Sequence, residues 1–138
     1  MAILFLDLKD FTSMAEGMDH ELLHDLVGGV MAALSRVVEV HGGYVDKIQG
    51  DQIMALFAAR TAGENDCVRA VSCAMRMMEV VEEFGAVLEE QGFPIGARAG
   101  ISYGDVTVAP DPAGHTTATG DEVNTASRLE EAAKTGSV

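Results

Sequence analysis

The sequence predicts an α+β fold, with helices on one side of a mostly antiparallel sheet. Three observations point to this class. Short apolar runs of strand length alternate with longer stretches of helical periodicity. Gly50-Asp51 and Tyr103-Gly104 separate strand-like runs in the way that hairpin turns do. The expected order is β-α-α-β-β-α-β-β-α, which contains pairs of adjacent strands.

The first half of the chain predicts a strand followed by two helices. Residues 2–6 form an apolar run that ends on Asp7, which is typical of a buried strand. Ser13-Met-Ala-Glu16 has the spacing of a capping box, so a helix is expected to start at Ser13. Residues 20–40 have helical periodicity. Gly28-Gly29 weakens that helix, and close packing against another element would explain the pair.

The second half predicts two hairpins and two helices. Strands are expected at 44–49 and 53–57, and a second hairpin at 97–102 and 106–109. The long helix expected between the hairpins, 64–90, has apolar positions at Val68, Val71, Met75, Met78, Val81 and Phe84. A last helix is expected from Asp121 to about residue 133. Residues 136–138 have the pattern of another strand, so we expect residues 1–138 to form one domain whose C-terminal part is missing.

Composition excludes several classes of protein. The formal net charge of −13 argues against a nucleic-acid partner, and an anionic substrate would need divalent metals to offset these acids. No apolar run is long enough to span a bilayer and no export leader is present, so we expect a cytoplasmic segment without direct membrane insertion. The parent protein could still be attached to a membrane. Cys67 and Cys73 are expected to be reduced, because their spacing on a helix points them to different faces.

Two acidic residues are candidate metal ligands. Asp7 follows the first strand and Asp51 lies in the first hairpin turn. Two carboxylates can hold a pair of hard cations if the sheet places these positions side by side. By themselves, acids at strand ends are mostly solvated or capping residues.

Four segments resemble, in the same order, the motifs of class III adenylyl and guanylyl cyclases. They are residues 3–13, 42–57, 100–106 and 120–129. The resemblance implies the ferredoxin-like catalytic fold of that family. It also implies an adenylate cyclase, which converts ATP to 3′,5′-cyclic AMP and pyrophosphate.

The resemblance assigns the metal and phosphate ligands. Asp7, Asp51 and the Leu8 carbonyl would bind two divalent ions, Mg²⁺ or Mn²⁺, which assist attack of the ribose 3′-hydroxyl on the α-phosphate. Backbone N–H groups at Phe11 and Thr12, between a strand and a helix, would bind the phosphates.

The resemblance also assigns the remaining site residues. Asn124 would orient the ribose, and Arg128 would stabilise charge on the pentacoordinate phosphate; they are four residues apart and share a helix face. Lys47 and Thr117 would select the base, favouring ATP over GTP. In this family the site is shared across a dimer, which implies a homodimer with two equivalent sites.

Other functions remain open at this point. Asp10 replaces the glycine usual in the family's phosphate loop, which favours a catalytically weak or inactive cyclase-homology module that binds nucleotide or dimerises. A guanylate cyclase is also possible. A diguanylate cyclase is disfavoured because Tyr44-Val45 follows Gly42-Gly43, where that site requires an acidic pair. His20 and His24 have the spacing of a metal pair, but an exposed helix face is the preferred interpretation.

Overall fold

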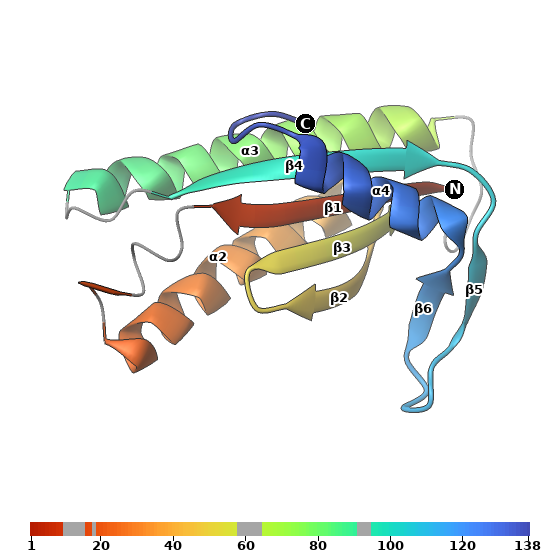
Figure 1. Cartoon of the computed structure of the whole chain (residues 1–138), viewed down its shortest axis with the longest axis horizontal. Coiled ribbons are helices and arrows are strands. Elements are labelled where there is room, and N and C mark those ends of the chain that lie inside the picture. Colours follow the sequence, from red (N-terminus) through yellow and green to blue (C-terminus); the bar gives the residue numbers. More distant parts are fainter. Residues whose placement is uncertain (10–15, 18, 58–64, 91–94) are drawn as a thin grey trace.

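The computed structural model of the chain describes residues 1–9, 16–17, 19–57, 65–90 and 95–138 (Figure 1). The start of a helix expected at Ser13 lies outside these residues. The helices and strands are β1 (Ala2–Lys9), α2 (His20–Val40), β2 (Tyr44–Gln49), β3 (Gln52–Phe57), α3 (Asp66–Glu90), β4 (Gly96–Tyr103), β5 (Thr107–Pro110), β6 (Thr116–Thr119) and α4 (Asp121–Ala132).

Four strands form one antiparallel sheet in the order β2-β3-β1-β4. This confirms the predicted α+β class. The central strand β1 pairs with β3 on one side and β4 on the other, so that Asp7 lies between Gln52 and Arg98. The apolar run of β1 therefore has a hydrogen-bonded strand on each edge. Asp7, the first polar side chain after this run, lies near the end of the pairing between β1 and β3.

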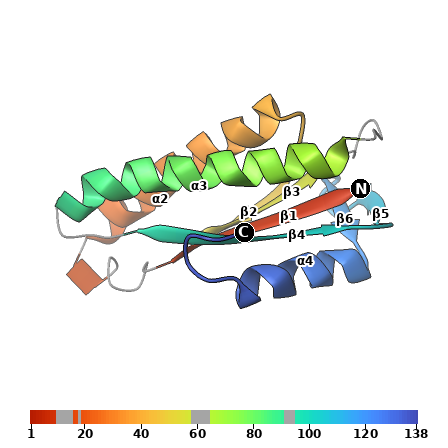
Figure 2. The ribbon, with the colours of Figure 1, turned by 90° about the horizontal axis from the view of Figure 1, so that it is seen from above.

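Helices cover both faces of the sheet, so the expectation of helices on one side is wrong. Figure 2 shows α2 and α3 over one face and α4 against the other. The reason is the alternation of β1. Leu4 and Leu6 enter the core beneath α2 and α3, whereas Ile3 and Phe5 enter a second core with Ala126 of α4. A strand that is apolar on both faces needs cover on both.

Helix α4 lies directly on β4 because Gly100 has no side chain. A Cβ built at Gly100 would lie 2.2 Å from the Glu130 nitrogen and 2.7 Å from the Ala126 oxygen, and both belong to the backbone of α4. Backbone atoms cannot move aside as a flexible side chain can. This glycine therefore sets how closely α4, with its polar outer face, approaches the sheet.

The predicted hairpin between 97–102 and 106–109 is wrong. Strand β5 does not pair with β4; it pairs with β6 in a separate two-stranded sheet. Strand β6 was not predicted, because Thr116–Thr119 is short and polar and has no apolar alternation. The strand expected at residues 136–138 is represented by two backbone bonds to β4, from the Gly136 amide to Ala97 and from the Ala99 amide to Ser137.

Two predictions about helix packing also need correction. In α3 the first half of the predicted apolar face is exposed, at Val68, Val71 and Met75. The core side of this part of α3 is formed instead by Met77 and by the small residues Ala70, Cys73 and Ala74. The small residues let α3 lie close to α2 and the sheet. A Cβ added at Gly28 or Gly29 in α2 meets nothing within 4 Å, so close packing within the described chain does not explain that pair.

Two expectations from composition can be compared with the structure. Cys67 and Cys73 are both free thiols, as predicted, and burial raises the pKa of Cys73 to about 12. None of the described helices has the length and hydrophobicity needed to span a membrane.

The contact at Gly100 predicts the effect of a single methyl group. Gly100→Ala is expected to lower the free energy of unfolding by about 1–3 kcal/mol, because α4 must shift away from β4. Gly29→Ala is the control, since it adds the same methyl to an open helix position and should raise stability by up to about 1 kcal/mol. Urea unfolding measures both changes. Equal effects of the two substitutions would contradict the close contact between α4 and β4.

Candidate active site

The structure brings Asp7, Leu8 and Asp51 together at one end of the sheet. Asp7 pairs with Gln52, the residue that follows Asp51. The Leu8 amide donates a hydrogen bond to the Asp51 carbonyl at 2.9 Å. Asp51 thus lies beside β1 although it is 43 positions away from Leu8 in the sequence. One predicted carboxylate lies on β1 and the other in the turn that leads into the neighbouring strand β3, so the two positions are side by side, as the metal-site hypothesis requires.

The carboxylates of Asp7 and Asp51 interact electrostatically. Burial raises the pKa of Asp51 above its ordinary value, and the negative charge of Asp7 raises it further. Lys9 offsets part of this repulsion, with its ammonium 3.0 Å from Asp7 Oδ2. Only 17% of the Asp7 side chain is exposed. The site therefore concentrates negative charge at a partly dehydrated position, where a bound cation is stabilised.

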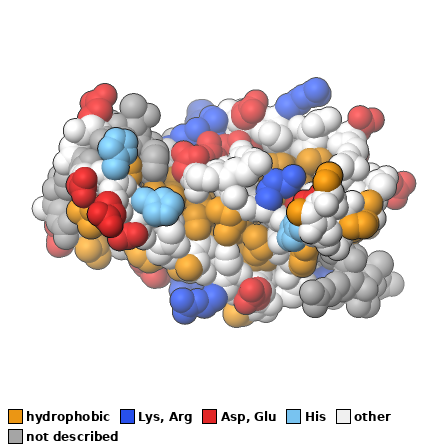
Figure 3. All heavy atoms as spheres, turned by 90° about the horizontal axis from the view of Figure 1, so that it is seen from below, with side chains coloured by type: hydrophobic (Ala, Val, Ile, Leu, Met, Phe, Trp, Pro, Cys, Tyr) orange, Lys and Arg blue, Asp and Glu red, His pale blue; other side chains and the backbone are white. Residues whose placement is uncertain are grey.

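A pocket of about 470 Å³ opens next to Asp51, between α2 and the β2–β3 hairpin. Figure 3 shows this side of the molecule, with apolar side chains exposed along its middle. His20 and His24 line the pocket and are exposed, as expected for a helix face. No group of three or more metal-binding side chains occurs among the residues that the structure describes, so the pocket adds no third ligand of this kind to the two carboxylates.

A β-bulge in β2 turns Lys47 toward the α4 side of the sheet. Val45 pairs with Ala55 and packs beneath α2 and α3, so regular alternation would place Lys47 on that same side. The register instead shifts between Val45 and Lys47. Lys47 consequently pairs with Met54, which belongs to the core beneath α4. With 42% of its side chain exposed, Lys47 faces the same side as Asp7.

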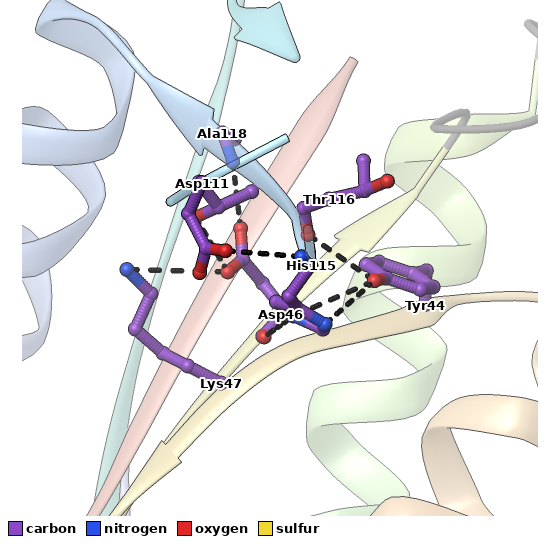
Figure 4. A network of polar contacts seen from close by, with 8 residues as sticks. Tyr44, Asp46, Lys47, Asp111, His115, Thr116 and Ala118 are labelled. Atoms are coloured by element: carbon purple, nitrogen blue, oxygen red, sulfur yellow. Dashed lines mark hydrogen bonds and ion pairs between the residues drawn. The ribbon is translucent and has the colours of Figure 1, made fainter. Parts of the chain in front are cut away.

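A buried carboxylate, Asp46, brings Lys47 and Thr117 together (Figure 4). The Thr117 hydroxyl donates to Asp46 Oδ1 at 2.8 Å, and the Lys47 ammonium lies 3.9 Å from the same oxygen. The Ala118 amide donates to the other oxygen, Oδ2, at 2.8 Å. The two residues predicted to select the base are therefore neighbours in space, although they are 70 positions apart in the sequence.

Further contacts hold the β5–β6 ribbon against β2. The His115 ring donates from Nε2 to the Asp46 carbonyl and stacks on the Tyr44 ring, with centroids 5.9 Å apart. The Tyr44 hydroxyl donates to the Thr116 carbonyl at 3.1 Å. These bonds fix the strand that carries Thr117.

Sequence reasoning did not identify Asp46. An acid beside a lysine in a short strand is usually solvated, and the sequence does not mark the bulge that turns Asp46 inward. The signal that could have been used is its position immediately before the predicted base-selecting Lys47. In the structure the residue is only 2% exposed.

Asn124 and Arg128 lie on the exposed face of α4, one turn apart, as predicted. Neither side chain makes a hydrogen bond or ion pair with another residue in the described part of the chain. The opposite face of the same helix is buried through Ala126 and Glu130, and Glu130 forms an ion pair with Arg98 at 2.8 Å. Helix α4 is thus anchored on one side and presents a cation and an amide on the other.

Three residues of the predicted phosphate loop lie outside the part of the chain that the structure describes. They are Phe11 and Thr12, predicted to bind phosphate, and Asp10. Their roles stay predictions.

The geometry matches a known family. The family model described as the adenylate and guanylate cyclase catalytic domain matches residues 1–138. The chain belongs to the class III cyclase family. This confirms the resemblance found in the four sequence motifs.

Individual relatives of this cyclase domain agree with the assignment. An adenylate cyclase of Anabaena cylindrica is 35% identical over 138 residues, which cover 94% of this chain but only 26% of that enzyme. The crystal structure of the adenylyl cyclase CyaB from P. aeruginosa matches with a TM-score of 0.91 and 32% identity, over 98% of this chain and 72% of that one. The guanylyl cyclase Cya2 matches with a TM-score of 0.87 and 30% identity, over 97% and 70%.

The raised pKa of Asp51 predicts a pH-dependent stability in this cyclase domain. Because the folded chain binds the Asp51 proton more tightly than the unfolded chain, stability falls as the pH rises through the folded pKa. Asp51→Asn removes the charge, so it should raise the melting temperature at pH 7 in metal-free buffer. The gain should disappear below the ordinary carboxyl range, where Asp51 is neutral in both states.

The matched control is Asp105→Asn, which removes one charge from an exposed position. Thermal unfolding with EDTA at pH 7 and pH 3 measures both variants. A loss of stability at pH 7 in Asp51→Asn, or the same gain in Asp105→Asn, would contradict the repulsion between Asp7 and Asp51.

Proposed function

We propose that this domain is an adenylate cyclase that converts ATP to 3′,5′-cyclic AMP and pyrophosphate at sites shared across a homodimer. The observation that carries the proposal is the convergence of Lys47 and Thr117 on one oxygen of Asp46. This pair faces the side of the sheet that also carries Asp7. Membership of the cyclase family supports the reaction class.

The residues at the end of β1 fit a pair of divalent ions. Asp7, Asp51 and the Leu8 carbonyl offer only oxygen donors, which Mg²⁺ and Mn²⁺ prefer. Burial and the negative charge of Asp7 together raise the pKa of Asp51, which supports a cation as the natural counter-charge. When bound there, the two ions supply charge that lowers the pKa of the ribose 3′-hydroxyl and neutralises the triphosphate.

Arg128 and Asn124 act on the reacting part of the substrate. The ribose 3′-hydroxyl loses its proton to water, and its oxygen forms a bond to the α-phosphorus. The bond between the α-phosphorus and the oxygen that bridges to the β-phosphate breaks in line, releasing pyrophosphate. The guanidinium of Arg128 donates to the α-phosphate oxygens, where negative charge accumulates. The amide of Asn124 hydrogen-bonds the ribose and directs its hydroxyl. Backbone N–H groups at Phe11 and Thr12 hold the remaining phosphates.

The active site is completed by a second copy of the chain. The side chains of Asn124 and Arg128 are exposed and make no hydrogen bond or ion pair within the described residues, which supports a role toward a partner. In a symmetric homodimer one protomer supplies Asp7 and Asp51, and its partner supplies Lys47, Thr117, Asn124 and Arg128. Two equivalent sites result, and the monomer is inactive.

Activity of the full-length protein tests the proposal. With ATP and Mn²⁺ the parent protein should form cyclic AMP, and Asp51→Ala should abolish the product. Arg128→Ala should lower kcat by roughly 10²–10³-fold, because it removes charge stabilisation in the transition state. Arg36→Ala is the matched control, since Arg36 is exposed on α2 on the other face of the sheet. No product from the parent protein, together with no metal-dependent ATP binding, would support the inactive module instead.

Mixing variants tests the shared site separately. Combining Asp51→Ala with Arg128→Ala protomers should restore part of the activity, because one of the two sites in a heterodimer is then intact. Each variant is first assayed alone as the control. A mixture no more active than the two variants would argue against a site shared between protomers.

A further inference from the structure

We propose that Asp46 is a specificity-determining residue that makes this site select adenine, by fixing the Thr117 hydroxyl as a hydrogen-bond acceptor toward the base. The inference rests on the proposed function, in which Lys47 and Thr117 contact the base. It assigns a role to a residue that touches neither the base nor the phosphates.

The hydrogen bond between Thr117 and Asp46 has a fixed direction. A threonine hydroxyl carries a single hydrogen and two lone pairs. The Asp46 carboxylate accepts hydrogen bonds, and its Oδ1 lies 2.8 Å from Thr117 Oγ1. The hydroxyl hydrogen therefore points to Asp46, and only lone pairs remain for a second partner. Thr117 can then accept from a ligand but cannot donate to it.

Burial of Asp46 enforces this direction. The Asp46 side chain is fully buried, so water does not compete for its oxygens. Oδ2 is occupied by the Ala118 amide at 2.8 Å, and the Thr117 hydroxyl is the hydrogen-bond donor to Oδ1. Leaving a buried carboxylate oxygen without this donor is costly. Reversal of the threonine hydroxyl is thus disfavoured as long as Asp46 is a carboxylate.

The hydrogen-bonding groups of Lys47 and Thr117 are complementary to adenine and not to guanine. Lys47 can only donate, and Thr117 can only accept, so together they present a donor and an acceptor side by side. Adenine offers the complement, with N1 as acceptor and the N6 amino group as donor. Guanine offers the reverse, with N1–H as donor and O6 as acceptor. The polarity set by Asp46 therefore favours ATP and opposes GTP at both positions.

Asp46→Asn tests the polarity without changing the shape of the side chain. The asparagine oxygen can still accept from Ala118, while its NH₂ group donates to Thr117. The threonine hydroxyl is then free to donate to guanine O6. We expect the ratio of kcat/KM for ATP to that for GTP, measured with Mn²⁺ on the full-length protein, to fall by roughly tenfold or more. An unchanged ratio would overturn the proposal.

A double-substitution comparison separates polarity from a structural role. Thr117→Val removes the hydroxyl, so adding Asp46→Asn to it should leave the ATP:GTP ratio of Thr117→Val unchanged. If Asp46 only holds β6 against β2, Asp46→Asn would lower kcat/KM for ATP and for GTP equally. Alternatively, it would change the ATP:GTP ratio also when it is added to Thr117→Val. Either of these results would contradict the proposal.

Two further variants decide the question if Asp46→Asn fails to fold. Thr117→Ser retains the hydroxyl hydrogen that Asp46 accepts, so the ratio of kcat/KM for ATP to that for GTP should equal that of the unsubstituted protein. Thr117→Val should lower this ratio. Equal ratios in the two variants would overturn the proposal. Competition of ATP and GTP against a fluorescent ATP analogue with Mn²⁺ gives the ratio of the two binding affinities, in which the same direction of change is expected. The selectivity of the site can therefore be measured even if the unsubstituted protein forms no cyclic nucleotide.

Discussion

The burial of β1 on both faces is the constraint on which the rest of the structure depends. The strand has hydrogen-bonded neighbours on both edges and a separate apolar core on each side. Every side chain from Ala2 to Leu6 is buried, so Asp7 is the first position at which a charge can be accommodated. Because side chains alternate along a strand, Asp7 lies on the same face of the sheet as Ile3 and Phe5. Helix α4 covers only part of that face. The apolar run and the candidate metal ligand are two consequences of one strand.

The α4 side of the sheet gathers the remaining polar groups through two local departures from regular structure. The bulge in β2 rotates Lys47 out of the α2–α3 side, and Gly100 lets α4 lie close to β4. Asp46, the residue at the bulge, then reaches Thr117 on β6. The bulge and the glycine are each small features, but together they place residues from three parts of the chain along one surface.

Much of the fold could be predicted, because its signals are local. The apolar run of β1, the periodicity of α2 and the turn at Gly50-Asp51 each act within a few residues, and the structure contains all three elements. The pairing of β5 with β6 could not be predicted, because Thr116–Thr119 is polar and is held by the distant residues Asp46 and Tyr44. The placement of α4 depends on contacts at Gly100 that periodicity does not show.

The candidate site was found through motifs, not through physical signals. Asp7 and Asp51 are ordinary strand-end acids until the sheet register joins them. Asp46 was missed because its importance comes from burial, which depends on a bulge and on a strand 70 residues away. Side chains that act through another residue leave little trace in a single sequence.

The most direct test is a crystal structure of the full-length protein with Mn²⁺ and an uncleavable ATP analogue, using anomalous scattering to locate the metal. Manganese is expected between Asp7 and Asp51 of one protomer, with the adenine against Lys47 and Thr117 contributed by the second copy. Manganese bound away from these carboxylates, or a nucleotide held entirely by one chain, would contradict this arrangement.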